Sequence, residues 1–314
     1  MGKIVMTGVD GNFGGYSANR ILELVPAENL IFTSPSLGKI EKYKDSGAEL
    51  READFNNVES LRDAFSGGET LLLISMPFVG EKRRRAHKNA IDAAVACGVK
   101  KLIYTSIVGA GVEENDAYEI ADHKYTEQYL CAQDIDYVIL RDSQYAEAMV
   151  SAYEEAINNT NGVLSNNMGE GKMAFVSRND CAEAAACVAA GAGEKNTIYF
   201  ISGPEAMTIE KYLATANEVT GNTVTYNYIT DEEMFGFFDS IGVPRETDGD
   251  WAESAKNFPF CSEGMVTFGK AIRLGQMDNC TNDFNMLTGK DPLTVKDMFE
   301  NIQEHRIGER RSKD

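Results

Sequence analysis

The first fifteen residues, MGKIVMTGVDGNFGG (residues 1–15), decide the fold. Residues 3–7 read as a short buried strand, and glycines at positions 8, 11 and 14 follow it in G-x-x-G-x-x-G spacing before an apolar helix. Gly8 allows a tight turn, Gly11 lets the backbone approach a phosphate, and Gly14 lets the helix pack closely on the strand. The amides and the positive dipole end of the helix favour an anion. The stretch therefore predicts a pyrophosphate site; a glycine-rich turn without a ligand is the alternative.

Composition and charge restrict the class of protein. The chain has 314 residues, of which 43% are hydrophobic and 25% charged, as is typical of a globular protein with one large domain or a domain and a smaller lobe. The formal net charge of −19 argues against nucleic acid or an anionic membrane as partner. No apolar run approaches the ~18 residues of a membrane span, and polar residues near the start argue against a signal peptide. We therefore expect a cytoplasmic protein that does not bind a membrane.

Cysteine and histidine usage gives no sign of a metal site. The six cysteines are scattered and none forms a C-x-x-C pair, which is typical of reduced thiols in the cytoplasm. The three histidines, His87, His123 and His305, are too far apart to suggest a shared metal ion. We therefore expect no metal.

Strand-like and helix-like segments alternate up to Arg141. The expected strands are residues 3–7, 30–33, 48–52, 70–75, 101–106 and 137–141. The expected helices are residues 14–24, 38–44, 58–65, 84–96 and 118–133. Such alternation predicts an α/β fold with a Rossmann-type, doubly wound parallel sheet covered on both faces. Strands on both sides of the first strand create the crevice in which nucleotides bind.

The pattern changes after Arg141. Helices are expected at residues 145–157, 182–190 and 231–239, strands at 197–202 and 223–228, and a helix at 208–220 with Thr208 as its N-cap. Residues 284–302 end in an amphipathic helix. We expect residues 1–150 to form the dinucleotide-binding domain, with a return segment near 173–203, and residues 151–314 to form a smaller α+β lobe that covers the substrate.

Several longer phrases carry a family resemblance. They are TGVDGNFGG, LLLIS (71–75), AHKNAIDAAVACGVKKLIYTS (86–106), ADHKYTEQYL, IDYVILRDSQYAE, GEGKMAFVSRNDCAEAA (169–185) and LTGKDPLTVKDMF. With them the chain resembles the NmrA-like atypical short-chain dehydrogenase/reductases, most closely the bacterial NAD(P)H:quinone oxidoreductase type 2 group, over nearly its whole length. The resemblance implies a Rossmann domain with a smaller C-terminal lobe, NADPH as ligand, and the activity of a quinone or aromatic reductase or of a redox sensor without turnover. It leaves open whether the chain forms a homodimer.

The resemblance also implies where the cofactor lies. The glycine turn would hold the pyrophosphate, residues after the third and fourth strands would reach the adenine and a ribose, and residues 140–145 would line the mouth of the nicotinamide site. The cofactor contacts expected on this basis are Thr7, Gly8, Gly11, Asn12, Phe13, Gly14, Ser34, Asp54, Phe55, Ser75, Met76 and Ser143. Phe55 has an equal alternative as a core residue. Tyr145 and Arg178 are expected at the substrate, and an ion pair with Asp180 is the alternative for Arg178.

The end of the second strand departs from the family pattern. An arginine commonly stands there and binds the 2′-phosphate of NADP. This chain has Thr33-Ser34-Pro35-Ser36 with Lys39 beyond, and no acidic residue at that point to hold a free 2′-hydroxyl. Two hydroxyls and a lysine favour NADPH, with NADH as the alternative.

The proton donor of ordinary short-chain dehydrogenases is also missing. Their Tyr-x-x-x-Lys pair lowers the tyrosine pKa. Here Tyr118 is followed four residues later by Asp122, which would raise that pKa. His123 lies about where related isoflavone-reductase-type enzymes place a catalytic lysine, so it is a candidate proton donor. Tyr145 is the second candidate. A helix-surface histidine and an aromatic lid are the respective alternatives.

We therefore expect an NAD(P)H-dependent oxidoreductase that transfers a hydride to a small aromatic or quinone-like acceptor. Two alternatives stay open. One is a non-catalytic NmrA-like regulator that senses NAD(P)(H). The other is a reductase of benzylic ethers or aryl ketones of the isoflavone-reductase-like kind.

Overall fold

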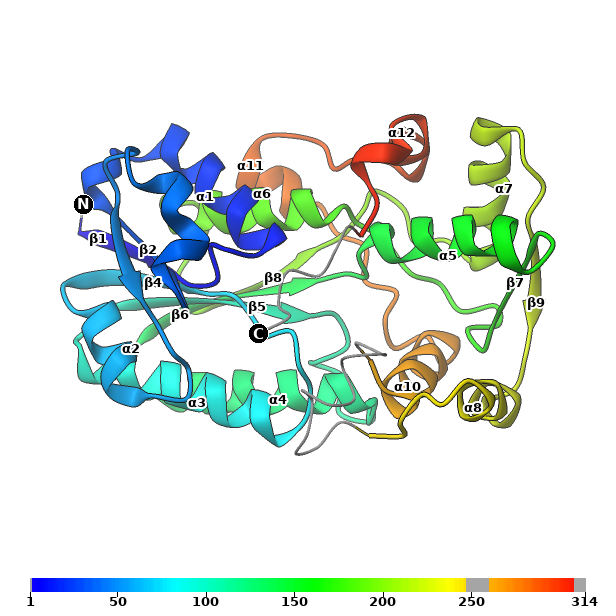
Figure 1. Ribbon diagram of the computed structural model, residues 1–314, viewed down its shortest axis with the longest axis horizontal. Coiled ribbons are helices and arrows are strands. Elements are labelled where there is room, and N and C mark those ends of the chain that lie inside the picture. Colours follow the sequence, from blue (N-terminus) through cyan, green and yellow to red (C-terminus); the bar gives the residue numbers. More distant parts are fainter. Residues whose placement is uncertain (1, 247–259, 308–314) are drawn as a thin grey trace.

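A seven-stranded sheet forms the centre of the computed structural model, which describes residues 2–246 and 260–307 (Figure 1). Every neighbouring pair of its strands runs parallel. From one edge to the other the strands are β3 (Glu49–Glu52), β2 (Leu30–Ser34), β1 (Lys3–Met6), β4 (Gly68–Leu73), β5 (Lys101–Ile107), β6 (Asp136–Asp142) and β8 (Thr197–Ile201). The doubly wound parallel sheet is confirmed, and β1 lies between β2 and β4 as expected.

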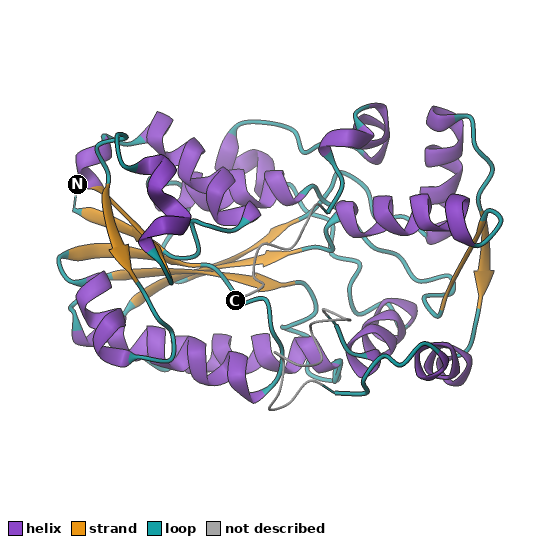
Figure 2. Cartoon of the chain, in the orientation of Figure 1, coloured by secondary structure: helices purple, strands orange, loops and turns teal. Residues whose placement is uncertain are grey.

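Helices cover both faces of this sheet (Figure 2). One face carries α1 (Asn12–Leu24), α6 (Arg178–Ala189) and α11 (Asp283–Thr288), and the other carries α2 (Val58–Phe65), α3 (Glu81–Ala96) and α4 (Tyr118–Cys131). The strands of this sheet are continuous apolar runs because both of their faces are buried, as strand β4 shows. Leu72 packs in the core under α1 and α6, whereas Leu71 and Leu73 pack under α2 and α3.

The remaining elements form a second cluster beside the carboxyl ends of the strands (Figure 1). They are α5 (Ala146–Asn159), β7 (Val163–Asn166), α7 (Ile209–Thr220), β9 (Thr225–Tyr228), α8 (Asp231–Ser240), α10 (Ser262–Arg273) and α12 (Val295–Glu300). Strands β7 and β9 pair in parallel as a small sheet of their own. Tyr153, Tyr212 and Phe299 stack edge to face in the core of this cluster. The division of the chain near residue 150 stays a prediction, since α6 and β8 return to the main sheet after β7.

Local signals in the sequence explain some element ends. Thr208 caps α7 as expected, because its side chain accepts from the Lys211 amide. The segment expected as a helix at 38–44 is the 3₁₀ helix η2 (Leu37–Tyr43), and two further short 3₁₀ helices are η1 (Ala27–Asn29) and η3 (Ile302–Glu304). Strand β7 and helix α10 were not expected from the sequence. Residues 284–302 are two helices because Gly289 ends the first in a left-handed conformation.

No helix in the described part of the chain is long and apolar enough to cross a membrane.

Candidate cofactor and active site

The glycine turn connects β1 to α1 with the geometry that the spacing predicts. Gly8 has a φ of +63°, in the left-handed region that favours glycine. Gly14 lies in α1 directly against the turn. A Cβ on Gly14 would lie 2.7 Å from the Gly8 carbonyl carbon and closer still to its oxygen. Gly14 therefore permits the close packing of the helix on the turn.

Gly11 has a different reason to be glycine. It is the N-cap of α1 with a φ of −80°, a conformation open to any residue, and a Cβ there would meet only the Gly8 oxygen at 3.4 Å. Packing within the chain does not require a glycine here. Gly11 and Asn12 are exposed, and no side chain caps the start of α1. The open backbone and the positive end of the helix together fit a pyrophosphate. Phe13, by contrast, is 8% exposed and packs in the core.

Thr7, at the end of β1, links two strands. Its Oγ1 donates to the Leu72 carbonyl (3.2 Å) and accepts from the Ile74 amide (3.0 Å). The hydroxyl thus connects the carboxyl end of β1 to that of β4. A direct contact of Thr7 with cofactor stays a prediction.

An acidic residue of β3, which was not expected from the sequence, lies beside the end of β2. Thr33 Oγ1 donates to the Met6 carbonyl (3.1 Å), and the buried Ser34 Oγ accepts from the Ser36 amide (3.4 Å). Ser34 pairs in register with Glu52 of β3, and a Glu52 carboxylate oxygen accepts from the Leu37 amide (3.5 Å). The exposed Glu52 carboxylate therefore lies beside the segment expected to hold the 2′-phosphate. Only the pairing register of β2 with β3 reveals it.

Asp54 and Phe55 follow β3. Asp54 is exposed, and its carboxylate accepts from the Asn56 amide (2.9 Å). Phe55 is 8% exposed and belongs to the core cluster under α2 and α3. This placement agrees with the core alternative for Phe55. A contact of either residue with the adenine stays a prediction.

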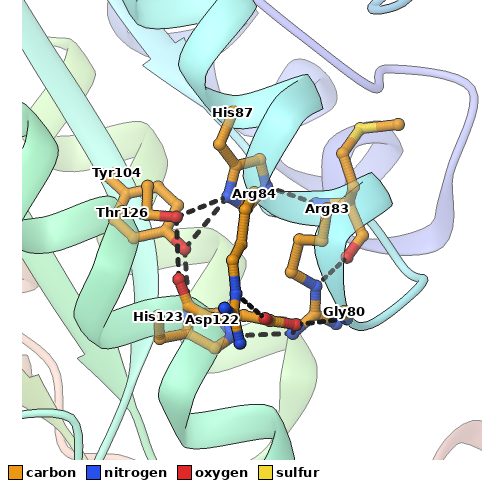
Figure 3. A network of polar contacts seen from close by, with 9 residues as sticks. Gly80, Arg83, Arg84, His87, Tyr104, Asp122, His123 and Thr126 are labelled. Atoms are coloured by element: carbon orange, nitrogen blue, oxygen red, sulfur yellow. Dashed lines mark hydrogen bonds and ion pairs between the residues drawn. The ribbon is translucent and has the colours of Figure 1, made fainter. Parts of the chain in front are cut away.

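The segment between β4 and α3, residues 74–80, is held by a buried polar network (Figure 3). The Ser75 amide donates to Thr105 Oγ1 (2.9 Å). The Met76 amide donates to His87 Nε2 (3.0 Å), and Arg83 Nε donates to the Met76 carbonyl (3.1 Å). At the far end of the segment, the Gly80 amide donates to an Asp122 carboxylate oxygen (2.6 Å).

Asp122 lies in α4, four residues after Tyr118. It is fully buried in α4, and Arg84 Nε donates to its second oxygen (2.6 Å). Its carboxylate therefore binds the start of α3. Glu127 lies one helical turn beyond His123. Its carboxylate accepts a hydrogen bond from Ser106 Oγ (2.6 Å) and forms a bidentate ion pair with Arg141.

His123 is enclosed between α3, α4 and β5 (Figure 3). Its Nδ1 lies 2.8 Å from the Tyr104 hydroxyl and its Nε2 lies 3.3 Å from Arg83 Nη1. A guanidinium can only donate, so Nε2 accepts and the ring is neutral with its proton on Nδ1. Burial, and then the charge of Arg83, hold the pKa of His123 well below its usual value. In this arrangement both ring nitrogens are occupied, which favours a structural role over proton donation. A catalytic role stays a prediction.

The end of β6 contains a buried carboxyl group that sequence reasoning also missed. Asp142 is 3% exposed, and its Oδ2 accepts from the Tyr145 hydroxyl (3.3 Å). Its Oδ1 is buried without a hydrogen-bond partner among the described residues. Burial raises the pKa of Asp142 to about 8 and that of the Tyr145 hydroxyl well above its usual value. Ser143 beside it donates to the Met173 sulfur (3.2 Å) and is also buried.

Asp142 makes the stability of the fold depend on pH in a measurable way. The folded chain holds the Asp142 proton up to a pH of about 8, whereas the unfolded chain releases it near pH 4. The wild type therefore loses stability from this group as pH rises from 5 to 7, and Asp142→Asn does not. We expect the free energy of unfolding of the wild type minus that of Asp142→Asn to fall by roughly 2 kcal/mol over this interval. Urea denaturation at both pH values measures it, and a constant difference would contradict a buried neutral carboxyl.

Arg178 begins α6 and meets the C-terminal segment. Its backbone amide donates to both carboxylate oxygens of Glu147 (3.0 and 3.1 Å), and its Nη1 donates to the Ile307 carbonyl (3.3 Å). Asp180, the alternative partner, accepts from the Leu293 amide (2.9 Å). A contact of Arg178 with substrate or phosphate stays a prediction.

Comparison with known proteins identifies the family. Residues 29–191 match the model of the NAD(P)H-binding family. The chain is 33% identical over 242 residues to quinone oxidoreductase 2 of Escherichia coli strain K12, covering 77% of this chain and 82% of that protein. The chain belongs to the NAD(P)H-binding family. The glycine turn, residues 8–14, lies outside the matched residues, on the other side of α1.

Solved structures agree with this assignment. The NADPH complex of the Escherichia coli NADPH-dependent quinone oxidoreductase superposes with a TM-score of 0.84 at 27% identity, over 96% of this chain and 99% of the other. Triphenylmethane reductase of Citrobacter sp., complexed with NADP(H), gives 0.81 at 29% identity, over 95% and 99%. The resemblance to the quinone oxidoreductase type 2 group is thereby confirmed. The chain is an NAD(P)H-dependent reductase related to these two enzymes.

In the described residues no group of three or more His, Cys, Asp or Glu side chains is placed to hold a metal ion.

Proposed function

We propose that the protein reduces a small quinone-like aromatic acceptor with NADPH. The observation that carries the proposal is the open glycine turn at the start of α1, in a chain of the NAD(P)H-binding family. The names of the similar enzymes, a quinone oxidoreductase and a triphenylmethane reductase, support a flat aromatic acceptor.

Residues at the carboxyl ends of the strands bind different parts of the cofactor. The amides of residues 11–14 bind the pyrophosphate, Ser34 lies toward the 2′-phosphate, and Ser75 and Met76 lie along a ribose. The bound dinucleotide supplies the hydride. The chain contributes orientation and exclusion of water at the mouth formed by Ser143 and Tyr145.

Reduction of a quinone needs little acid catalysis, because the aromatic ring stabilises the negative charge on the reduced oxygens. The missing Tyr-x-x-x-Lys pair is therefore compatible with this acceptor. We propose that the Tyr145 hydroxyl donates a hydrogen bond to the acceptor oxygen, in place of the one that it donates to Asp142 in the free protein. The Asp142 carboxyl, whose pKa burial raises to about 8, then donates its own proton to the Tyr145 oxygen and orients the hydroxyl. The high pKa of Tyr145 keeps this hydroxyl protonated at neutral pH.

An absorbance assay tests the proposed reaction. The purified protein is mixed with NADPH and a panel of benzoquinones, naphthoquinones, triphenylmethane dyes and aryl ketones, and the absorbance at 340 nm is followed. We expect acceptor-dependent loss of absorbance with at least one quinone. Tight NADPH binding without oxidation by any acceptor would contradict the reductase proposal and support a nucleotide sensor.

Glu52 provides a prediction about cofactor choice. Its carboxylate, beside the end of β2, repels a 2′-phosphate. We expect Glu52→Gln to strengthen NADPH binding relative to NADH by about threefold to tenfold, as befits a screened surface charge worth on the order of 1 kcal/mol. Dissociation constants of both nucleotides for both proteins measure this ratio. An unchanged ratio would show that the 2′ position lies away from Glu52.

A further inference from the structure

Two side chains of α3 hold both backbone polar groups of a single residue in the segment 74–80. The Met76 amide donates to His87 Nε2 at 3.0 Å, and Arg83 Nε donates to the Met76 carbonyl at 3.1 Å. His87 and Arg83 are one helical turn apart on α3 and are both buried, His87 fully and Arg83 to 6% exposure. Figure 3 shows them on the side of the helix that faces the network. The peptide groups on either side of Met76 are thus fixed by side chains.

Only one form of His87 satisfies these contacts. Because Nε2 accepts from the Met76 amide, the ring proton is on Nδ1, which lies 3.0 Å from Thr126 Oγ1. Thr126 Oγ1 in turn donates to the Asp122 carbonyl (2.9 Å), so it has a lone pair for the imidazole. A chain of hydrogen bonds therefore runs from α4 through His87 to the backbone of the segment.

The rest of the network fixes the position of this chain. Tyr104 of β5 packs edge-on against the His87 ring with centroids 5.3 Å apart. Asp122 binds the Gly80 amide at the other end of the segment (2.6 Å) and also Arg84. The segment is therefore anchored at Met76 and at Gly80, with Ser75 immediately before the first anchor.

We infer that His87 and Arg83 are positioning residues for the cofactor: by fixing both polar groups of Met76 they hold the segment after β4 in the shape that receives a ribose of the dinucleotide. This inference rests on the proposed function, because the contact of Ser75 and Met76 with the ribose is part of it. It assigns a function to His87, a histidine outside the glycine turn and outside the proposed proton-donor pair.

Three variants test the inference through binding alone. His87→Leu removes the acceptor for the Met76 amide, and we expect the Kd for NADP⁺ to rise about tenfold or more at pH 7. His87→Gln offers an amide oxygen in place of Nε2 and is expected to restore the Kd to within about threefold of wild type. Tyr129→Phe is the control, because it removes a hydrogen bond between α4 and α3, from the Tyr129 hydroxyl to Asp92 (2.5 Å), that does not reach residues 74–80. Its Kd is expected to stay at the wild-type value. Titration calorimetry measures Kd, and circular dichroism confirms that each variant is folded.

The outcomes separate two failures. Equal Kd values for wild type and folded His87→Leu, or an equal loss in His87→Leu and His87→Gln, would overturn the positioning role while leaving the proposed function intact. Absence of NADP⁺ binding by the wild type would overturn both. Should His87→Leu not fold, hydrogen exchange of the wild type decides: we expect the Met76 amide to exchange slowly and to be protected further by NADP⁺. Fast exchange, or no added protection, would contradict the inference.

Discussion

Replacing Gly14 by alanine is expected to destabilise the protein by roughly 3 kcal/mol or more, one of the largest effects available to a single methyl group in this chain. The added Cβ would lie 2.7 Å from the Gly8 carbonyl carbon and 3.0 Å from the Val9 Cα. These are backbone atoms, so no side chain can rotate away. Strand β1 and helix α1 would have to separate, and urea denaturation would show the loss directly.

Gly236→Ala is the matched control for this prediction. Gly236 also lies within an α-helix, α8, but a Cβ there would meet nothing within 4 Å. We expect this variant to keep or slightly increase the stability of the wild type, since alanine favours helix more than glycine does. Similar unfolding free energies for the two variants would mean that the glycine turn is not packed against α1 as described.

Replacing Gly11 by alanine is expected to leave the fold intact and to weaken NADPH binding by about a hundredfold. The conformation at Gly11 suits alanine, and its Cβ would meet the Gly8 oxygen only at 3.4 Å, so the free protein can accept it. The methyl group would instead stand where the backbone must approach the phosphates. Titration of NADPH fluorescence gives the Kd, and a thermal melt gives the stability of the same samples.

The contrast between Gly11 and Gly14 makes the second prediction specific. Gly14→Ala affects folding first, whereas Gly11→Ala affects binding alone. A Gly11→Ala variant that binds NADPH as tightly as wild type would show that the pyrophosphate lies elsewhere.

The glycine turn and the sheet were predictable from the sequence because their causes are local. An apolar strand followed by glycines at fixed spacing predicts a tight turn into a helix without reference to the rest of the chain. The alternation of apolar segments predicts the order of strands and helices. The ends of β1 and α2 were predicted to within one residue for the same reason.

The environment of the site depends on contacts that the sequence does not reveal. The lowered pKa of His123 follows from its burial by the packing of three elements and from the charge of Arg83 on α3. Glu52 reaches the end of β2 only through the register of two parallel strands. Asp142 reads as an ordinary residue at the end of a strand, and its raised pKa comes from burial by neighbouring elements.

A crystal structure with NADPH bound tests the central claim most directly. We predict that oxygens of the pyrophosphate accept hydrogen bonds from amides of residues 11–14 and that a ribose lies against Ser75 and Met76. A cofactor whose pyrophosphate lies away from the start of α1, with the glycine turn left open to solvent, would contradict the account.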